Sequence, residues 1–539
     1  MKWRTQPKPL GCLLALALGG ASACEDGLHL QGDAGTDEGG ATAEDSVFRP
    51  DDVAAPDVRE ETDGASETDE ASGGEDLGLD EAGPTCPMWV APREPRPDDD
   101  GTRDRPWGGL AAALEGRGAC DHLVLLAGGV TDRHAADVNV RLSSGQTLLL
   151  EGEPESAPPP RFDGRHESPV LAAVGEGTLV LRHLAFENGG GGGCLSAQVA
   201  ELRLEDTQWS ACRSGGSGGA VRSFADRLEV IGSVFADNRA EGDGGALVVD
   251  GPPARAAVVI DGCRFVRNQA VNGGAVALVV PTTESAIQSS RFSDNVAAGG
   301  GSAVWGYLGG RIVGNRFERN AGGVEGGAVA GQAGWYLSEI AQNVFVGNQT
   351  RNVGSSGTSC CDAAAALDLS VAYVTIRNNL FLRNRSLPDP VYRVSGVGAL
   401  RVSTGAPRIL NNTFADNESS AGVAHVSASN ADLRNNVFVG PVGAAVANQA
   451  VPGGWAVTDF NAAWNVSEPA FGGSAPAGDG NLETDPAFVD PAADDYRLRS
   501  GSPCSDAGDP AEDQRDPDGS RNDIGAFGGS GGAWTPLGA

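Results

Sequence analysis

The sequence predicts an all-β protein, a right-handed parallel β-helix, on three observations. The 539 residues include 79 glycines, and only 6% are aromatic, which fits many short strands broken by glycine better than helices. A pattern of aliphatic, aromatic and asparagine residues recurs every 23 to 36 residues, the period of a solenoid. The repeats lack the apolar spacing of a helix.

Each repeat is centred on an aromatic residue. The ten aromatic positions are Phe186, Trp209, Phe235, Phe265, Phe292, Phe317, Phe345, Phe381, Phe414 and Phe438, and an aliphatic residue stands five positions before each. With coils stacked about 4.8 Å apart, these residues would form two interior columns. We therefore assign them a structural role.

Asparagine follows three positions after seven of these aromatic residues, from Asn238 to Asn417. Because asparagine tolerates a left-handed backbone and bonds to nearby main chain, we expect these residues to line a turn. Gly-Gly-Ala segments recur at 218, 244, 273 and 326 and predict a tight bend before the next strand.

The paired "GGA[VL]" and "FxxN" elements over 186–440 resemble the repeats of polymorphic outer-membrane proteins. Those proteins are surface β-helices involved in adhesion. The resemblance implies an adhesive surface protein.

The N-terminus predicts export. Residues 1–23 read as a signal peptide, with a basic start and the apolar run 10–18. "ASAC" (21–24) resembles a bacterial lipobox, which would make Cys24 the lipidated residue; the alternative is ordinary cleavage after Ala23. We expect an outer-membrane lipoprotein at the cell surface, or an extracellular protein, that touches the membrane only through its lipid anchor.

Residues 24–84 predict a disordered acidic tether. Residues 25–84 hold 20 Asp and Glu against two Arg, which gives −18 of the net charge of −33. Such a segment buries too little apolar area to offset its ordering entropy. The overall charge excludes a general nucleic-acid binder, because little would neutralise phosphates.

Residues 85–130 predict a cap and the first strand. Pro106 would begin a helix whose stripe of Trp107, Leu110 and Leu114 covers the open end of the stack. "HLVLLAGG" follows as the first buried strand. Repeats would then span 131–450, and 451–539 would hold the C-terminal coils and a tail.

Eight cysteines remain after Cys12 and Cys24, and an even number in an exported chain indicates disulfides. Eight cysteines allow 105 pairings, so sequence alone leaves most open. We expect a Cys86–Cys120 bridge that pins the cap, and a Cys194–Cys212 bridge.

The tail at 485–529, taken with the "DGT…PW…L…AL" start, resembles that of bacterial choice-of-anchor Q proteins. These are exported, pectin-lyase-like right-handed β-helices with varied surface anchors. The resemblance implies fold and location, and the family shares no single activity. In this chain Cys24 would be the anchor.

Few residues suggest catalysis. Asp368 and Arg401 occupy equivalent outward positions in adjacent repeats, where a salt bridge explains them. His425 occupies a usually aliphatic position in "GVAHV", so we expect a histidine at the edge of the core. "DPDGSRND" (516–523) is rich in oxygen ligands, so calcium is possible there, although it fails the EF-hand register. A turn closing the C-terminal end is the simpler interpretation, and we expect no other cofactor.

Four aromatic residues should point outward by strand alternation: Trp305, Tyr307, Trp335 and Tyr373. They lie near the long insertions 346–362 and 385–396, and flat exposed rings suit sugar stacking. The alternative is that they pack beneath loops.

The leading hypothesis is therefore a monomeric, non-catalytic binder of a polysaccharide or another cell-surface ligand. The alternative is a polysaccharide lyase or glycoside hydrolase. Outward carboxylates beside an Arg in a groove would favour the enzyme, and an aromatic face would favour binding.

Overall fold

The computed structural model describes residues 87–126, 138–154, 156–166, 169–251, 257–281, 285–323, 326–333, 337–351, 363–387, 396–419, 423, 425–440, 444–449, 456–472 and 477–538. All of them belong to one compact unit, Asp80–Ala539. The predicted signal peptide, Cys24, the tether and Cys86 lie outside the described residues. Within the described residues, no helix has the length and hydropathy needed to span a membrane.

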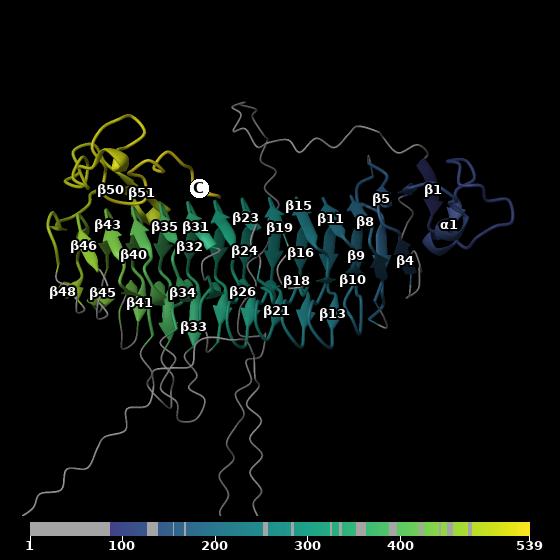
Figure 1. The fold of residues 1–539 in the computed structure, drawn as a ribbon, viewed down its shortest axis with the longest axis horizontal. Helices are drawn as coiled ribbons and strands as arrows, with labels where there is room; N and C mark the ends of the chain where they lie inside the picture. Colours follow the sequence, from purple (N-terminus) through teal and green to yellow (C-terminus); the bar gives the residue numbers. More distant parts are fainter. Residues whose placement is uncertain are drawn as a thin grey trace, which may run out of the picture. The chain divides into compact units, whose positions relative to one another are not determined.

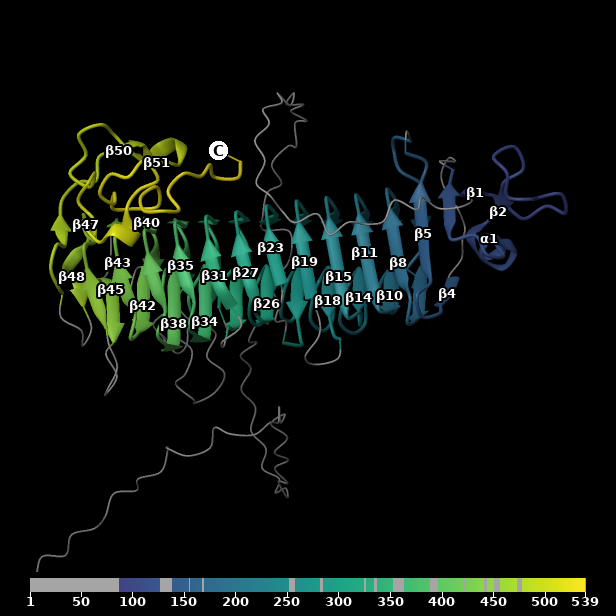
Figure 2. The ribbon, with the colours of Figure 1, turned by 45° about the horizontal axis from the view of Figure 1, so that its top comes forward.

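The chain winds through four parallel sheets, which we name I to IV in the order in which a coil visits them (Figures 1 and 2). One coil, for example, contributes β14, β15, β16 and β17 before β18 begins the next coil in sheet I. Each strand pairs in parallel with its equivalent one coil away. The predicted fold class, an all-β parallel β-helix, is confirmed.

Sheet I has 13 described strands in this order: β4 (Val138–Leu142), β7 (Leu171–Gly175), β10 (Leu195–Gln198), β14 (Val221–Ser223), β18 (Leu247–Val249), β22 (Val276–Leu278), β26 (Val304–Tyr307), β30 (Val329–Gln332), β34 (Leu367–Ala372), β38 (Leu400–Gly405), β42 (Val426–Ser429), β45 (Ala444–Gln449) and β48 (Ser467–Gly472). Sheet II has 15: β2 (Trp107–Gly108), β1 (Pro87–Ala91), β3 (His122–Leu125), β5 (Thr147–Gly152), β8 (Thr178–Arg182), β11 (Glu201–Glu205), β15 (Arg227–Ile231), β19 (Ala257–Asp261), β23 (Ser285–Gln288), β27 (Gly310–Val313), β31 (Leu337–Ala341), β35 (Thr375–Arg377), β39 (Arg408–Leu410), β43 (Asp432–Arg434) and β46 (Val457–Asp459).

Sheet III has 13 described strands: β6 (Arg161–Asp163), β9 (Ala185–Glu187), β12 (Gln208–Ser210), β16 (Val234–Ala236), β20 (Arg264–Val266), β24 (Arg291–Ser293), β28 (Arg316–Glu318), β32 (Val344–Val346), β36 (Leu380–Leu382), β40 (Thr413–Ala415), β44 (Val437–Val439), β47 (Ala462–Trp464) and β49 (Leu482–Glu483). Sheet IV has eight: β13 (Arg213–Ser214), β17 (Arg239–Ala240), β21 (Gln269–Ala270), β25 (Val296–Ala297), β29 (Ala321–Gly322), β33 (Gln349–Arg351), β37 (Arg385–Leu387) and β41 (Glu418–Ser419).

The predicted aromatic column runs through the interior behind sheet III. Its rings stack face to face, with centroids 4.3 to 6.0 Å apart, from Phe186 to Phe438. Phe162 extends the column one coil further than the sequence pattern showed. The predicted aliphatic column lies in register in sheet II. Both columns are buried and form the core.

The predicted asparagine column is a buried hydrogen-bond ladder between sheets III and IV. From Asn238 to Asn417, each Nδ2 donates to Oδ1 of the next asparagine at 2.9 to 3.0 Å. A second ladder, between sheets II and III, runs from Asn315 through Asn343, Asn379, Asn412 and Asn436 to Asn461. Both satisfy amide groups that would be costly to bury unpaired.

The Gly-Gly-Ala bends lie against the outer side of sheet I. The first glycine has a positive φ, between 61° and 93°, at Gly218, Gly244, Gly273 and Gly326. A Cβ on Gly244 would come within 3.0 Å of Val248 Cβ, so the bend has room only for glycine. This bend covers the outward residues that follow it, which explains why Val248 and Ala277 are buried.

The N-terminal cap differs in detail from the prediction. The helix α1 spans Leu110–Gly116 and begins after Trp107, which lies in β2. The predicted start at Pro106 was wrong, because β2 pairs with β1 in the register Val90↔Trp107. Trp107 and Leu114 still pack against the core beside buried Leu110. The strand over His122–Leu125 is buried as expected, but β1 and β2 precede it in the sheet.

The C-terminal tail folds back over sheet III (yellow in Figures 1 and 2). It contains β50 (Phe488–Asp490), β51 (Asp495–Leu498) and the short 3-10 helices η2 (Pro491–Ala493) and η3 (Glu512–Gln514). Its apolar residues form a second core with outward residues of sheet III; this core includes Phe488, Tyr496, Ile524, Leu380, Leu382 and Val437.

Corner residues between sheets II and III hold the tail in place. Asn378 donates to the carbonyl oxygens of Ala526 and Gly528, and Asn411 donates to Asn522 Oδ1. The expectation that 516–523 closes the C-terminal end was therefore wrong, since this loop docks beside coils about a hundred residues upstream in sequence.

Candidate functional site

The outward aromatic residues only partly form the surface that the sequence predicted. Trp305 and Tyr307 point outward from β26, and Tyr307 is 41% exposed. Tyr373, which follows β34, is 44% exposed. Because β30 lies between β26 and β34, Tyr307 and Tyr373 are two coils apart. Trp335 and most of the insertions 346–362 and 385–396 lie outside the described residues.

Asp368 and Arg401 form the salt bridge that the sequence indicated. They are register partners in β34 and β38, with Arg401 Nη2 2.8 Å from Asp368 Oδ1. Asp368 is only 3% exposed and also accepts a hydrogen bond from Ala364 N at 2.8 Å. The Asp368 carboxylate therefore stabilises the bend at Ala364, just before β34.

His425 lies in the core, one position from where the sequence pattern placed it. Val426, not His425, aligns with Leu400 at the aliphatic position. The sequence alignment was off by one residue because this repeat lacks the Gly-Gly pair that marks the position in other repeats. His425 is fully buried, and burial lowers its pKa to about 3. It is therefore neutral at ordinary pH and unsuited to general-base chemistry.

The carboxylates of Asp516 and Asp518 in the acidic loop 516–523 accept hydrogen bonds within the tail itself. Asp516 accepts hydrogen bonds from the backbone N–H groups of Asp523 and Gly529, and Asp518 accepts from Ser520. Burial raises the pKa of Asp516 to about 6. Among the described residues, no group of three or more His, Cys, Asp or Glu able to hold a metal occurs. Calcium binding by this loop stays a prediction.

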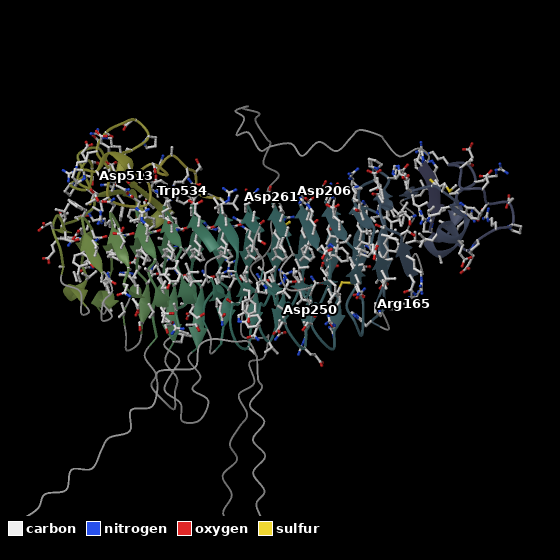
Figure 3. The ribbon with its side chains drawn as sticks, in the orientation of Figure 1. Arg165, Asp206, Asp250, Asp261, Asp513 and Trp534 are labelled. Carbon is white, nitrogen blue, oxygen red and sulfur yellow. A yellow bond between two sulfur atoms is a disulfide. The ribbon has the colours of Figure 1, made fainter. Side chains whose placement is uncertain are left out.

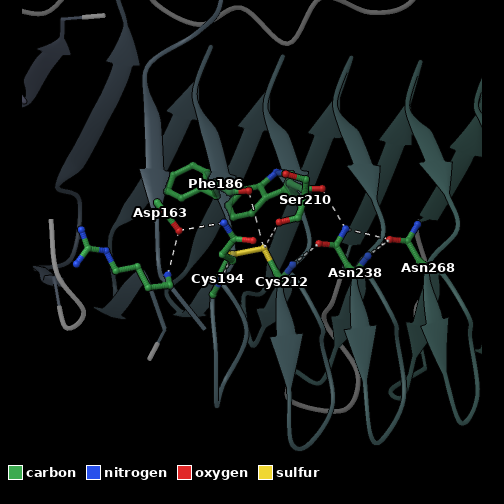
Figure 4. Close-up of a disulfide and its surroundings, with 11 residues drawn as sticks. Asp163, Phe186, Cys194, Ser210, Cys212, Asn238 and Asn268 are labelled. Atoms are coloured by element: carbon green, nitrogen blue, oxygen red, sulfur yellow. Dashed lines mark hydrogen bonds between the residues drawn. A yellow bond between two sulfur atoms is a disulfide. The ribbon is translucent and has the colours of Figure 1, made fainter. Parts of the chain in front are cut away.

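The disulfide between Cys194 and Cys212 joins two cysteines that the sequence analysis paired. Figure 4 shows that Cys212 stands where later coils carry ladder asparagines, and its backbone N–H donates to Asn238 Oδ1 at 3.1 Å. Cys120 is also disulfide-bonded. The Cys86–Cys120 pairing stays a prediction, since Cys86 lies outside the described residues.

A polar groove of about 460 Å³ lies between the outer face of sheet II and the C-terminal tail. Its floor comes from three successive strands, β31, β35 and β39, and its wall from the tail. The lining residues are Glu339, Thr375, Arg377, Asn378, Arg408, Leu410, Asn411, Asp513, Gln514 and Ser530. Figure 3 labels Asp513 on the tail.

The charges in the groove are unequally paired. Arg377 Nη2 lies 2.6 Å from Glu339 Oε1, so that guanidinium is neutralised. Arg408 Nε lies 3.6 Å from Asp432 Oδ2, and half of its side chain is exposed. Asp432 is shared with Arg434, which approaches it to 2.9 Å. Arg408 is thus the groove guanidinium most available to a ligand.

Sequence reasoning missed this groove. Arg377 and Arg408 occupy ordinary outward positions in "TIR" and "RIL", and the wall is made by residues more than 100 positions later. A usable signal lay in the corners after sheet II. They carry asparagine at 378, 411 and 435, where the tail docks. The upstream corners are mixed: Asp206, Gly232, Gly262, Ser289 and Gly314.

Comparison with known proteins does not identify a family for this chain. No protein-family model and no curated protein matches the sequence. Among solved structures, the chain is similar to a pectate lyase, Pel9A, with 12% identity over 82% of this chain and 96% of that chain and a TM-score of 0.30. A similarity at this level carries no conclusion about this chain.

The fold is therefore established by the strand pairing itself: the chain is a parallel β-helix protein with a polar groove. The resemblances to choice-of-anchor Q proteins and to polymorphic outer-membrane repeats stay predictions.

Proposed function

We propose that the protein is an exported, surface-anchored β-helix that binds an acidic polysaccharide in the groove, without catalysis. The observation that carries the proposal is Arg408, a half-exposed guanidinium at the floor of a polar groove with one loose ion-pair contact. A guanidinium binds a carboxylate through two parallel N–H donors, which suits the acid group of a sugar.

The rest of the groove offers partners for sugar hydroxyl groups. The Thr375 and Ser530 hydroxyls and the Gln514 amide line it on opposite sides. A linear glycan lying across β31, β35 and β39 would meet one coil every 4.8 Å or so. Polar lining of this kind orients a ligand and gives specificity.

The outward aromatic residues support a second contact on the same ligand class. Trp305 and Tyr307 offer flat rings on sheet I, and exposed rings of this type stack on sugars. Trp305→Ala should then weaken polysaccharide binding, with thermal unfolding nearly unchanged. If Trp305→Ala binds as tightly as wild type, Trp305 is not part of the site, and the groove alone binds the polysaccharide.

The export part of the proposal rests on "ASAC" before an acidic segment. Fatty-acid labelling should mark the wild-type protein and not Cys24→Ser. An unlabelled wild-type protein that begins at residue 24 would refute the lipoprotein assignment and leave the groove proposal standing.

A polysaccharide lyase is the second candidate, because Glu339 and Asp513 place carboxylates beside Arg408 in the groove. Arg377 is held by Glu339 at 2.6 Å, which leaves Arg408 as the candidate base. A lyase also needs a group that neutralises the substrate carboxylate beside the base, so a lyase would need Arg377 or another group in addition to Arg408.

The test is binding of purified protein to polyuronates and to neutral glucans, measured by calorimetry. We expect binding to the acidic glycans alone and at least a tenfold loss in Arg408→Ala. Arg311→Ala is the matched control, because Arg311 is an exposed outward arginine of sheet II, in β27, outside the groove. Equal loss in both variants would show general charge attraction and contradict a groove site.

A further inference from the structure

Three arginines stand in register on the outer face of sheet III. Arg264, Arg291 and Arg316 are successive partners in β20, β24 and β28. The rings behind them are 4.8 and 4.9 Å apart, which sets the spacing of these coils. Like charges directly opposite each other in a sheet repel. We call these three residues the arginine ladder.

At several other places, outward arginines lie beside carboxylates. On sheet II, Arg182 lies between Glu151 and Glu205, at 3.4 and 2.6 Å. At the corner after sheet III, Arg267 pairs with Asp237, and Arg319 pairs with Asp294. The arginine ladder departs from this arrangement in a chain whose net charge is −33.

Only one ladder member has a carboxylate partner in the described part of the chain. Arg316 Nε lies 2.9 Å from Glu318 Oε2. Arg291 Nε is buried without a hydrogen-bond partner, and a buried donor left unpaired is costly. No ion pair of Arg264 occurs among the described residues. Among the described residues, Arg264 and Arg291 therefore have no hydrogen-bond acceptor, and Glu318 acts on Arg291 only through its charge.

One side of the ladder is enclosed by the tail. A Cβ on Gly538 would collide with the Arg291 guanidinium, so the tail backbone lies directly against that side chain. Arg291 Nε is thereby shielded from water, which strengthens its interaction with an anion.

We propose that Arg264 and Arg291 bind a tetrahedral oxyanion, a sulfate or phosphate group, between their two coils. Each guanidinium offers two parallel N–H donors, so the pair needs up to four acceptor oxygens. A carboxylate has two oxygens and satisfies one guanidinium. A sulfate or phosphate group has three or four and satisfies both. The site is separate from the groove and does not depend on the proposed function.

The group can come from a free ion or from an ester on a polymer, and the experiment separates the two. Calorimetry at constant ionic strength titrates the full chain with sodium sulfate, with sodium phosphate, and with dextran sulfate against neutral dextran. Binding of the inorganic ions indicates a free-ion site, whereas binding of dextran sulfate alone indicates an ester. In either case, Arg264→Gln/Arg291→Gln should weaken affinity at least tenfold.

The matched control is Arg213→Gln/Arg239→Gln. These residues are also register partners, but both are exposed on sheet IV, and the change in charge is the same. We expect less than a twofold effect. Equal losses in the two double variants, or no binding of any of these anions by the wild-type protein, would overturn the proposal. Unchanged thermal unfolding in both variants shows that the comparison concerns folded protein.

Discussion

Asn417 donates a hydrogen bond of 3.2 Å from Nδ2 to Nδ1 of His425. Asn417 is the last asparagine of the ladder between sheets III and IV, so a buried imidazole terminates that ladder. The other ring nitrogen of His425 is buried without a partner in the described structure. The ladder thus ends on a residue that must stay neutral while the protein is folded.

This relationship predicts that stability depends on pH through His425. Burial lowers its pKa to about 3, against about 6.5 in an unfolded chain. The unfolded state therefore binds the proton first, and the contribution of neutral His425 is lost as pH falls below 6.5. We expect this group to cost roughly 3 kcal/mol between pH 7 and pH 4.

Denaturant unfolding of wild type and His425→Gln at several pH values measures this contribution. Both proteins should carry Asp516→Asn, because the raised pKa of Asp516 acts in the opposite direction, adding stability as pH falls below about 6. Parallel pH profiles for the two proteins would show that His425 does not titrate in this way.

The asparagine ladder should carry much of the stability of the coils. Asn348 Nδ2 donates to Asn384 Oδ1 at 3.0 Å and to the Phe317 carbonyl oxygen at 2.9 Å. Asn348 Oδ1 also accepts from the backbone N–H and from Nδ2 of Asn320. Asn348→Ala removes all of these bonds and leaves the buried Asn320 donors without that acceptor, so it should cost about 3 kcal/mol of unfolding free energy. Gln269→Ala, an exposed change on sheet IV, should stay within about 0.5 kcal/mol. A ladder variant as stable as this control would contradict the prediction.

The repeat could be predicted from sequence because it is local. The phenylalanine column follows from a side chain repeated once per coil, and every coil must meet the same packing requirement. The second ladder was also visible in the "NN" pairs at 378 and 411, but the two adjacent asparagines have different roles. Asn379 points inward to Asn412, and Asn378 bonds the tail.

The tail and the groove could not be predicted in the same way. Their contacts join residues more than 100 positions apart, such as Asn411 and Asn522. The repeat pattern in the sequence does not indicate which of such distant residues pair. The outward residues of sheet III under the tail are apolar, as with Leu380 and Leu382. In the sequence they read as ordinary strand residues.

The corner asparagines should control docking of the tail. Asn411 has a φ of 49°, so Asn411→Gly removes its hydrogen bonds to Asn522 and Asp523 and keeps the backbone compatible. We expect limited proteolysis to cut within 505–530 several times faster than in wild type, with the coils intact. Asp206→Gly, at an equivalent corner away from these tail contacts, is the control. Similar cleavage rates in both variants would argue against this role.

The disulfides give a prediction for the cap. Non-reducing peptide mapping should recover Cys194 with Cys212, a pair separated by 18 residues, and Cys86 with Cys120. Loss of the bridge between Cys194 and Cys212 in the double alanine variant should cost about 3 kcal/mol. Recovery of Cys120 with any cysteine other than Cys86 would refute the predicted cap bridge.

The most direct test of the central claim is turnover and binding measured together on a panel of acidic polysaccharides. Purified protein is incubated with each polymer, with and without calcium, while absorbance of unsaturated products and retention of the polymer are followed. The account predicts retention of at least one polyuronate, lost in Arg408→Ala, with no unsaturated product. Product release by the wild-type protein that disappears in Arg408→Ala would contradict a non-catalytic binder and establish a lyase.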